Sequence, residues 1–316
     1  MANWTIIGTS GFARKTCVPT LLGASSATLL GCCGSTPEGG LEIQARFSLP
    51  RAYVSVEDIG SDPDVEAVWI TSPTGLHAEQ ATALMIAGKS VLIEKPLALT
   101  LAEAEHVKGV AERTGSKAAV GFHQRFKVAH RRARDLAASG VLGDIAYIRC
   151  HFLAAYDEEP AAWRRAASTA GGGWAVNDIG THLLDTVTFV SQSGVSEAKA
   201  LFGHVRFAYE TDDIFAGVLK LQSGAIASIE AATAVAAPTT RLELIGTRGS
   251  LVVEGSFQGS STLVLNGIRL ENHREDQAYS DQIQAFSMLL NGQSNDLASL
   301  QDGIDNVRWV ETMLRS

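Results

Sequence analysis

The 316-residue sequence predicts an α/β protein built from two domains. Up to about residue 120, short strand-like runs alternate with helical patterns, which is typical of a parallel sheet with crossover helices. After residue 121 several strand-like runs follow one another with little helix between them. This second pattern predicts an α+β domain with a large, mainly antiparallel, open sheet. We therefore expect domains at residues 1–121 and 122–316.

Four strands are expected in the first domain, at residues 4–7, 27–33, 67–70 and 90–94. Its clearest helix spans residues 100–115, where Thr100 and Glu103 form a capping box and Gly115 ends the helix. The apolar stripe of this helix consists of Leu101, Ala104, Val107 and Ala111.

The second domain is expected to start with a helix over residues 127–139 and a strand near residues 146–154, before a helix that begins near Asn177. Two hairpins follow, with turns at Ser223-Gly224 and Arg248-Gly249. The stripe of the closing helix consists of Ile304, Val307, Val310 and Leu314.

Composition and charge favour a soluble enzyme. The chain is 46% hydrophobic and 19% charged, with a net charge of -8 and a pI near 5.5. An acidic chain is a poor partner for nucleic acid or for an anionic membrane, so neither is expected. The basic cluster at residues 130–135 is interpreted as the solvated face of a helix.

Residues 14–34 imitate a bacterial lipoprotein signal, because a basic pair precedes an apolar run that ends in "LLGC". Pro19 and Gly23 interrupt that run, and the basic pair lies behind an apolar strand, so secretion is not expected.

No other stretch approaches the roughly 20 apolar residues of a membrane span. The four cysteines lack paired metal-ligand spacing, which indicates buried thiols in a reducing cytoplasm and no metal site.

The stretch "IIGTSGFA", residues 6–13, is similar to a dinucleotide-binding turn, G-x-G-x-x-G/A, in which Ser10 replaces the middle glycine. Gly8 and Ala13 hold the first and third places, and Gly11 keeps the backbone adaptable. The Ser10 hydroxyl is a candidate donor to a phosphate at the helix N-terminus. With a strand before it and a helix and strand after it, the turn predicts a Rossmann domain rather than a plain turn.

The end of the second strand bears on the choice between NAD and NADP. A ribose with a free 2′-hydroxyl usually meets a carboxylate there, and Gly34, Ser35 and Thr36 supply none. Ser35 and Thr36 are candidate hydroxyl donors, and Arg14 is a candidate phosphate ligand. We expect NADP in preference to NAD.

Two short motifs carry the predicted chemistry. Glu94-Lys95-Pro96 ends a strand and places Lys95 at the carboxyl edge of the parallel sheet, where ligands bind. Asp178 and His182 stand four residues apart near a helix start, hence on one face. Each has a plainer interpretation: a surface lysine, a helix-start charge, a buried structural histidine.

Taken together, these motifs resemble the glucose-fructose oxidoreductase/inositol dehydrogenase/rhizopine catabolism (Gfo/Idh/MocA) oxidoreductases. The resemblance runs nearly end to end and includes "TSPTGLH" at 71–77, "GFHQRF" at 121–126, "WRR" at 163–165 and "LIGTRGSL" at 244–251. Within the family, the chain is most similar to the 1,5-anhydrofructose reductase branch, where the middle glycine can also be replaced.

The resemblance implies roles for matching residues. Lys95 would hydrogen-bond the reacting oxygen, Asp178 would position the substrate or the histidine, and His182 would carry the proton, which suits an imidazole of pKa about 6.5. The residues expected to bind the cofactor are Gly8, Thr9, Ser10, Gly11, Phe12, Ala13, Gly34, Ser35, Thr36, Ser72, Pro73, His77, Glu94, Lys95 and Pro96. The residues expected to bind substrate are His123, Arg125, Trp163, Arg164, Asp178 and His182.

Several of these residues have alternatives that stay open. His77 either lies beside the cofactor or caps the helix that follows it. His123, Arg125, Trp163 and Arg164 either line the pocket or serve in packing, and Asp185 either orients His182 or faces water. Gly171 to Gly173 either pass close to the nicotinamide or form a flexible loop.

The function expected from the resemblance is hydride transfer between a nicotinamide cofactor and a secondary alcohol or ketone of a sugar, anhydrosugar, cyclitol or similar polyol. A homodimer or homotetramer is implied, since one sheet face packs against another subunit in this family. One alternative is a catalytically silent regulator that binds NAD(P). Another is an enzyme of related architecture acting on an amino acid or a tetrapyrrole.

Overall fold

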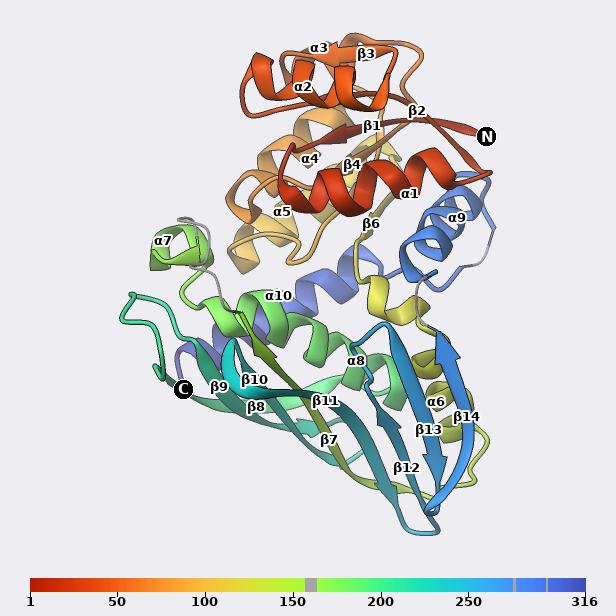
Figure 1. Cartoon of the computed structure of the whole chain (residues 1–316), viewed down its shortest axis with the longest axis vertical. Helices are drawn as coiled ribbons and strands as arrows, with labels where there is room; N and C mark the ends of the chain where they lie inside the picture. The colour runs from red at the N-terminus through yellow and green to blue at the C-terminus, as the bar shows by residue number, and fades with distance from the viewer. Residues whose placement is uncertain (157–163, 275–276, 294) are drawn as a thin grey trace. The chain divides into compact units, whose positions relative to one another are not determined.

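The computed structural model describes residues 1–156, 164–274, 277–293 and 295–316, which form two compact units (Figure 1). The first unit comprises Met1–Phe122 and Tyr279–Ile304, and the second comprises His123–Ala278 and Asp305–Ser316. Helix α10 (Leu300–Leu314) therefore contributes residues to both.

The first unit contains a six-stranded parallel sheet with the strand order β3-β2-β1-β4-β5-β6. Its strands are β1 (Ala2–Ile7), β2 (Ala27–Cys33), β3 (Arg51–Tyr53), β4 (Ala67–Ile70), β5 (Ser90–Ile93) and β6 (Ala118–Val120). Its helices are α1 (Val18–Gly23), α2 (Pro37–Phe47), α3 (Val56–Ser61), α4 (His77–Ile86), α5 (Leu101–Thr114) and most of α9 (Ala278–Leu290). The predicted Rossmann-type sheet is confirmed, while β3 and β6 are additional to the four strands predicted.

Local sequence explains these elements well. β4 is apolar along its whole length and completely buried, as expected of a strand covered on both faces. α5 starts with the predicted capping box: Thr100 Oγ1 accepts from the Glu103 N–H at 3.2 Å, and Glu103 Oε2 accepts from the Thr100 N–H at 3.1 Å. Gly115 ends α5 in the left-handed conformation.

The second unit contains an eight-stranded sheet with the order β14-β13-β12-β11-β7-β10-β9-β8. Its strands are β7 (Ile145–Ala155), β8 (Val195–Gly203), β9 (Ile214–Leu221), β10 (Ile226–Ala232), β11 (Ala234–Gly246), β12 (Ser250–Glu254), β13 (Ser260–Leu265) and β14 (Ile268–Arg274). Neighbouring strands are antiparallel except β7 and β10, which pair in parallel. The predicted large, mainly antiparallel sheet is confirmed, and both predicted hairpins turn where expected.

Helices α6 (Val128–Ala138) and α8 (Thr181–Ser191) cover one face of this sheet, and the short α7 (Ala167–Ala170) lies apart from it (Figure 1). α10 buries Ile304, Val307 and Val310 as predicted, and the fourth predicted position, Leu314, is half-buried against the same core. Met313 is completely buried in addition. No helix of the described residues covers the other face of the sheet, which we call the outer face.

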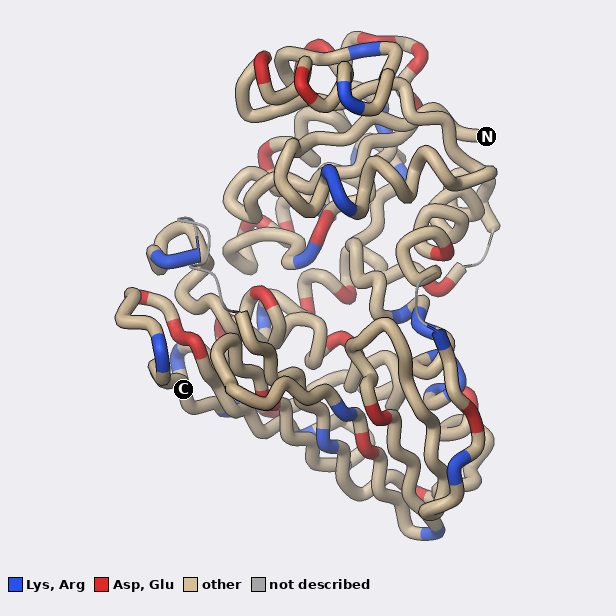
Figure 2. Tube along the Cα trace, in the orientation of Figure 1, with Lys and Arg blue, Asp and Glu red and all other residues tan. Residues whose placement is uncertain are grey.

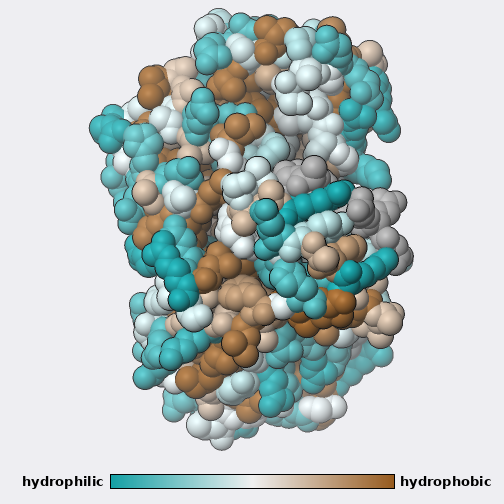
Figure 3. All heavy atoms as spheres, turned by 90° about the vertical axis from the view of Figure 1, so that its left-hand side faces the viewer, coloured by the Kyte–Doolittle hydropathy of each residue, from teal (hydrophilic) through white to brown (hydrophobic). Residues whose placement is uncertain are grey.

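Charged and apolar residues are spread over both units. Figure 2 shows acidic and basic residues along the whole trace, and Figure 3 shows apolar residues interspersed with hydrophilic ones on the face it presents. The arginines of the basic cluster are engaged within their unit: Arg131 lies over Phe126, Arg134 over Phe189, and Arg132 bonds Glu271. Among the described residues, no helix has the length and apolar character needed to cross a bilayer.

Candidate active site

The predicted cofactor-binding residues of the first unit leave the sheet at one edge. Ile7 ends β1 and pairs with Cys33 and Ile70, which end β2 and β4. Ile70 in turn pairs with Ile93, which ends β5. The segments 8–13, 34–36, 72–77 and 94–96 thus start side by side, at the carboxyl edge where a parallel sheet binds its ligands.

The first of these segments is a tight turn that needs its glycine. Gly8 has a φ of +120°, and a Cβ there would lie 2.5 Å from Thr71 Oγ1 and 2.9 Å from the Thr71 carbonyl oxygen. The Gly8 N–H donates to the Cys33 carbonyl at 2.9 Å. The chain therefore passes close to the end of β4 here, and only glycine fits.

Ser10 has a structural role at this turn. Its Oγ accepts a hydrogen bond from the Ala13 N–H at 3.3 Å, so Ser10 acts as the N-cap of the helix that follows. That helix begins at Gly11 and includes a π-helical turn, Ala13–Cys17. Phe12 packs against the ring of Tyr279, with 5.7 Å between the centroids. A capped helix start with exposed Ser10 and Gly11 fits the pyrophosphate of a dinucleotide.

The segment after β2 lies against this turn. A Cβ on Gly34 would lie 3.1 Å from Thr9 Cγ2, and Thr36 caps α2 by accepting from the Gly39 N–H. Arg14 Nε donates to the Thr9 carbonyl at 2.9 Å, and its two Nη atoms donate to the Glu42 carboxylate at 2.7 and 2.8 Å. Arg14 is therefore held beside the turn by a residue of α2.

The segments after β4 and β5 are joined through a buried histidine. His77 Nδ1 lies 2.8 Å from the Pro96 carbonyl oxygen and Nε2 lies 2.9 Å from the Ser72 carbonyl oxygen. Burial lowers the pKa of His77. The side chain of His77 thus links the turn after Pro73 to the Lys95-Pro96 turn, and it does not act as a helix N-cap.

Glu94 and Lys95 have different surroundings although they are neighbours. Glu94 is buried and its Oε1 accepts from Trp69 Nε1 at 3.0 Å. Burial raises the pKa of this carboxyl group to about 7. Lys95 is half-buried at the end of β5, and a cis peptide bond joins it to Pro96. Lys95 therefore remains accessible at the sheet edge, while Glu94 is part of the core.

In the second unit, Asp178 and His182 lie at the start of one long helix. That helix begins at Trp174, three residues before the expected start, and passes through a π-helical turn, Val176–Gly180, before α8. Such turns are frequent at functional sites. Asn177 Nδ2 donates to the carbonyls of Ala170, Gly171 and Gly173, so the glycine loop is fastened to the helix.

The structure brings Arg164 to Asp178 as well. Arg164 Nε donates to Asp178 Oδ2 at 3.1 Å, and both side chains keep part of their surface exposed. Burial, and in addition the charge of Asp178, raise the pKa of the Tyr156 hydroxyl group. Trp163, expected to bind substrate, lies outside the described residues.

His123 and Arg125 belong to a 3-10 helix, His123–Phe126, that packs against α8. The rings of His123 and His182 meet edge to face, with centroids 5.2 Å apart. Arg125 forms a buried ion pair with Asp185, in which Nη2 donates to Oδ1 at 2.6 Å. Asp185 is thus bound to Arg125 and buried, rather than facing water.

An aromatic cluster beside Asp178 was not predicted from the sequence. Its members are Tyr156, Trp174, Phe207 and Tyr209, whose successive centroid distances are 6.2, 5.8 and 5.5 Å. They come from three separate segments, and no motif or spacing in the sequence connects them.

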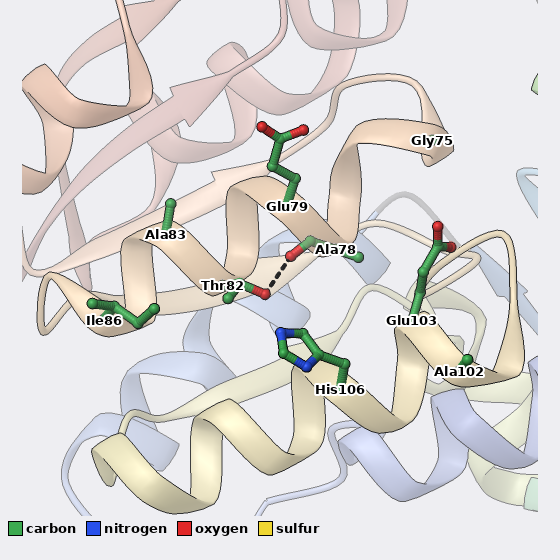
Figure 4. A pocket seen from close by; sticks show the side chains of 9 residues that line it. All are labelled: Gly75, Ala78, Glu79, Thr82, Ala83, Ile86, Ala102, Glu103 and His106. Atoms are coloured by element: carbon green, nitrogen blue, oxygen red, sulfur yellow. Dashed lines mark hydrogen bonds between the residues drawn. The ribbon is translucent and has the colours of Figure 1, made fainter.

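A surface hollow of about 700 Å³ lies elsewhere in the first unit, between α4 and α5 (Figure 4). The residues that line it are Gly75, Ala78, Glu79, Thr82, Ala83, Ile86, Ala102, Glu103 and His106. None of them was expected to bind a ligand. Among the described residues, no group of three or more His, Cys, Asp or Glu side chains is arranged to hold a metal ion.

Comparison with known proteins agrees with both halves of the chain. Residues 2–122 match the model of the oxidoreductase family with an NAD-binding Rossmann fold, and residues 130–252 match the GFO/IDH/MocA C-terminal domain. A curated relative, 1,5-anhydro-D-fructose reductase from Ensifer adhaerens, is 30% identical over 96% of this chain and 92% of its own length.

Solved structures show the same fold. The aldose-aldose oxidoreductase from Caulobacter crescentus, complexed with glycerol, has a TM-score of 0.89 at 23% identity, covering 99% of this chain and 96% of the other. Levoglucosan dehydrogenase in complex with NADH and L-sorbose has a TM-score of 0.87 at 22% identity, covering 100% and 96%.

These matches confirm the resemblance seen in the sequence motifs. They also agree with the geometry described above, because the turn at Gly8 and the sheet edge around it are those of a nucleotide-binding unit. The chain is therefore a member of the Gfo/Idh/MocA oxidoreductases, a family with an NAD-binding Rossmann domain.

Proposed function

We propose that this protein transfers a hydride between a nicotinamide cofactor and a secondary alcohol or ketone of a sugar, anhydrosugar, cyclitol or similar polyol. The observation that carries the proposal is the placement of Asp178 and His182 at the start of one helix, with Arg164 bound to the carboxylate. The relatives support the substrate class, since they are described as acting on anhydrofructose, aldoses and levoglucosan.

The cofactor supplies or takes up the hydride when it is bound. The residues that would hold it are those of the first turn, the segment after β2 and the turns joined by His77. Lys95 would donate a hydrogen bond to the reacting oxygen, because an ammonium group stabilises the negative charge that develops there. His182 would accept the hydroxyl proton during oxidation and return it during reduction. Asp178 would hold the substrate or the imidazole in place.

Cofactor binding and substrate binding are assigned to different parts of the chain. We propose that residues 1–121 bind the cofactor and residues 122–316 bind the substrate and the second subunit.

A catalytically silent regulator has no comparable support, since the curated relative is a reductase and the two structures are an oxidoreductase and a dehydrogenase. We also propose a cytoplasmic location, supported by four cysteines that are all buried thiols.

A substrate screen with two variants tests the function. Sugars, anhydro-ketoses and inositols are supplied with NADPH or NADH, and turnover is followed at the nicotinamide absorbance band. Lys95→Ala and His182→Ala are each expected to lower kcat by at least about a hundredfold while the Kd of the cofactor stays within about threefold.

Matched controls come from α5 of the first unit. Lys108→Ala and His106→Ala remove the same side-chain types from α5 and are expected to leave kcat unchanged. Full turnover in both Lys95→Ala and His182→Ala would overturn the assignment. Tight cofactor binding without turnover of any substrate would favour the regulator.

We further propose that NADP is preferred over NAD. Gly34, Ser35 and Thr36 place no carboxylate at the end of β2, and Arg14 lies beside the turn. Glu42 competes for the guanidinium, because it already accepts two hydrogen bonds from Arg14. A bound 2′-phosphate would have to replace that carboxylate as the partner of Arg14.

Fluorescence titration of four proteins tests this preference. NADPH is expected to bind the wild type more tightly than NADH, and Glu42→Gln is expected to increase the difference because it frees Arg14. Arg14→Ala is expected to raise the Kd of NADPH about tenfold and to change the Kd of NADH little, since a charge-assisted bond to phosphate is worth about 1.5–3 kcal/mol. Arg46→Ala, at the other end of α2, is the control. Tighter binding of NADH by the wild type would contradict the proposal.

A further inference from the structure

Two histidines of the second unit contact each other at the predicted site. His182 lies in the first turn of α8, and His123 opens the 3-10 helix that packs against α8. Their ring planes are inclined by 78° and their centroids are 5.2 Å apart. Two imidazolium ions at this distance would repel each other, so a proton on one ring disfavours a proton on the other.

The contact is fixed by the elements that carry the two rings. Arg125 follows His123 closely in the 3-10 helix, and its buried ion pair with Asp185 fastens that helix to α8 one turn beyond His182. The carbonyl of Gln124 bonds His130 Nδ1 at 2.9 Å, which fastens the 3-10 helix to α6 as well. These bonds fix the backbone of the 3-10 helix relative to α8 and α6, and thereby the positions from which the two rings project.

Gln124 also distinguishes the two rings. Its buried side-chain Nε2 lies 2.9 Å from His123 Nε2, and because an amide N–H can only donate, this ring nitrogen is the acceptor. An acceptor nitrogen carries no proton, so the bond with Gln124 stabilises the neutral form of His123. Protonation of His123 would cost this hydrogen bond.

Charged groups on the same elements have partners of opposite charge. On the helix of His182, Asp178 is bound by Arg164, and Asp185 is bound by Arg125. On α10, whose Asn306 donates to the Thr181 carbonyl, Asp305 is bound by Arg308.

The other described elements of the second unit that pack against α8 include α6, β7 and β10. α6 contributes His130, whose pKa burial lowers to about 3. Its charged residues have partners of their own: Arg131 lies over Phe126, Arg132 bonds Glu271, and Arg134 lies over Phe189 and beside Asp135. Lys127, the N-cap of α6, donates to the Gln258 carbonyl. β7 presents Cys150, a thiol kept neutral because burial raises its pKa. Successive side chains of a strand point to opposite faces of the sheet. The charged residues of β7 and β10 therefore point to the outer face; they are Arg149, His151 and Glu230.

We propose that His123 and His182 form a coupled pair that carries a single proton, and that Gln124 directs this proton to His182. The inference rests on the proposed function in one respect, namely that His182 is the group that exchanges a proton with the substrate. His123 is then a positioning residue, which keeps its neighbour as the one titrating base of the site. Gln124 acts through His123.

Nuclear magnetic resonance of ring-labelled histidines tests the pairing without using activity. In the wild-type protein, His182 is expected to titrate first and His123 at least about one pH unit lower. In His182→Phe, which keeps a ring at the contact but removes the charge, the midpoint of His123 is expected to rise by about one pH unit. Where this variant fails to fold, His182→Gln serves instead.

His106→Phe, an exposed position on α5, is the control and is expected to change neither midpoint. An unchanged midpoint of His123 in folded His182→Phe would overturn the pairing. This outcome is separate from the failure of the proposed function, which is read from the turnover of His182→Ala.

Gln124→Glu tests the direction of the proton. A carboxylate beside His123 stabilises its charged form, so the proton should move from His182 to His123. The midpoint of His182 is then expected to fall by about one pH unit, and the acidic limb of kcat/KM should move with it while KM at high pH stays unchanged. A merely structural role of Gln124 would change stability or KM and leave the His182 midpoint in place, which would overturn this part.

Discussion

At the scale of single residues, Glu94 shows how a site motif also serves the core. Its carboxyl group bonds Trp69 and lies so close to Gly121 that a Cβ there would approach Glu94 Oε1 to 2.9 Å. This burial raises its pKa from 4.5 to about 7. The neighbouring Lys95 is left as the accessible member of the motif.

Glu94→Gln is therefore expected to change the pH dependence of stability. The folded protein holds the Glu94 proton more tightly than the unfolded chain does, so its contribution is most favourable below pH 4.5 and is lost as the pH rises to about 7. Glutamine keeps the acceptor for Trp69 without the buried charge. The variant is expected to gain stability relative to the wild type between pH 5 and pH 8, by up to about 3 kcal/mol.

Urea unfolding at several pH values measures this effect. Glu79→Gln, a carboxylate on the surface of α4, is the control and should follow the wild type. Parallel pH profiles of Glu94→Gln and the wild type would contradict the prediction.

The place of a residue in the fold was predictable from the sequence where the residue belongs to a short local motif. Its contacts were much less predictable where the contacting group lies far away in the chain. The positions of Lys95, Asp178 and His182 follow from local patterns. The contacts of His77 do not, because the Pro96 carbonyl, 2.8 Å from its Nδ1, lies on a different loop. Ser10 was expected to contact phosphate, and the structure shows in addition that it caps a helix.

At the scale of elements, Asn177 fastens the helix that starts at Trp174 to the loop before it. Its amide group donates to three carbonyls of that loop, and Asn177 itself lies in the π-helical turn. Asp178 and His182 follow directly on this turn. The π-helical turn could not be predicted from the Asp-x-x-x-His spacing, because that spacing fits an ordinary α-helix equally well.

Asn177→Asp keeps the shape of the side chain but removes the donors. Three carbonyls lose a partner and face a negative charge, so we expect a loss of about 1–3 kcal/mol in unfolding free energy. Turnover is expected to fall because Asp178 and His182 lose their support. Asn291→Asp, where the amide donates to one carbonyl near the end of α9, should cost less. Equal stability of the two variants in urea unfolding would argue against this role.

At the scale of the whole molecule, the outer face of the eight-stranded sheet is the surface we propose for self-association. Leu201 on β8 is 81% exposed and Val218 on β9 is 53% exposed, and the two strands are adjacent. Apolar side chains on an uncovered sheet face favour burial against a second copy.

Leu201→Glu combined with Val218→Glu is expected to yield a monomer, whereas the wild type is expected to be a homodimer or homotetramer. Light scattering coupled to gel filtration measures the mass of each. Ile86→Glu, on exposed α4 of the first unit, is the control and should keep the wild-type mass. A monomeric wild type at about 50 µM, well above the Kd of a stable dimer, would contradict the proposal.

The large-scale architecture was predictable from alternating and consecutive strand patterns, whereas its long-range pairings were not. Parallel pairing of β7 with β10 joins segments about 80 residues apart in the chain. The inclusion of residues 279–304 in the first unit is similarly long-range: Phe286 packs on Trp4 with centroids 5.0 Å apart. Local periodicity cannot encode which distant surface a helix will cover.

That packing has a consequence for synthesis on the ribosome. Trp4 is completely buried, and Phe286 covers part of it, yet 281 residues are translated between the two. At about 5–20 residues per second, the nascent first unit waits roughly 15–60 seconds with this tryptophan uncovered. During that interval the apolar surface around Trp4 stays open to other chains, until the segment that carries Phe286 has been made.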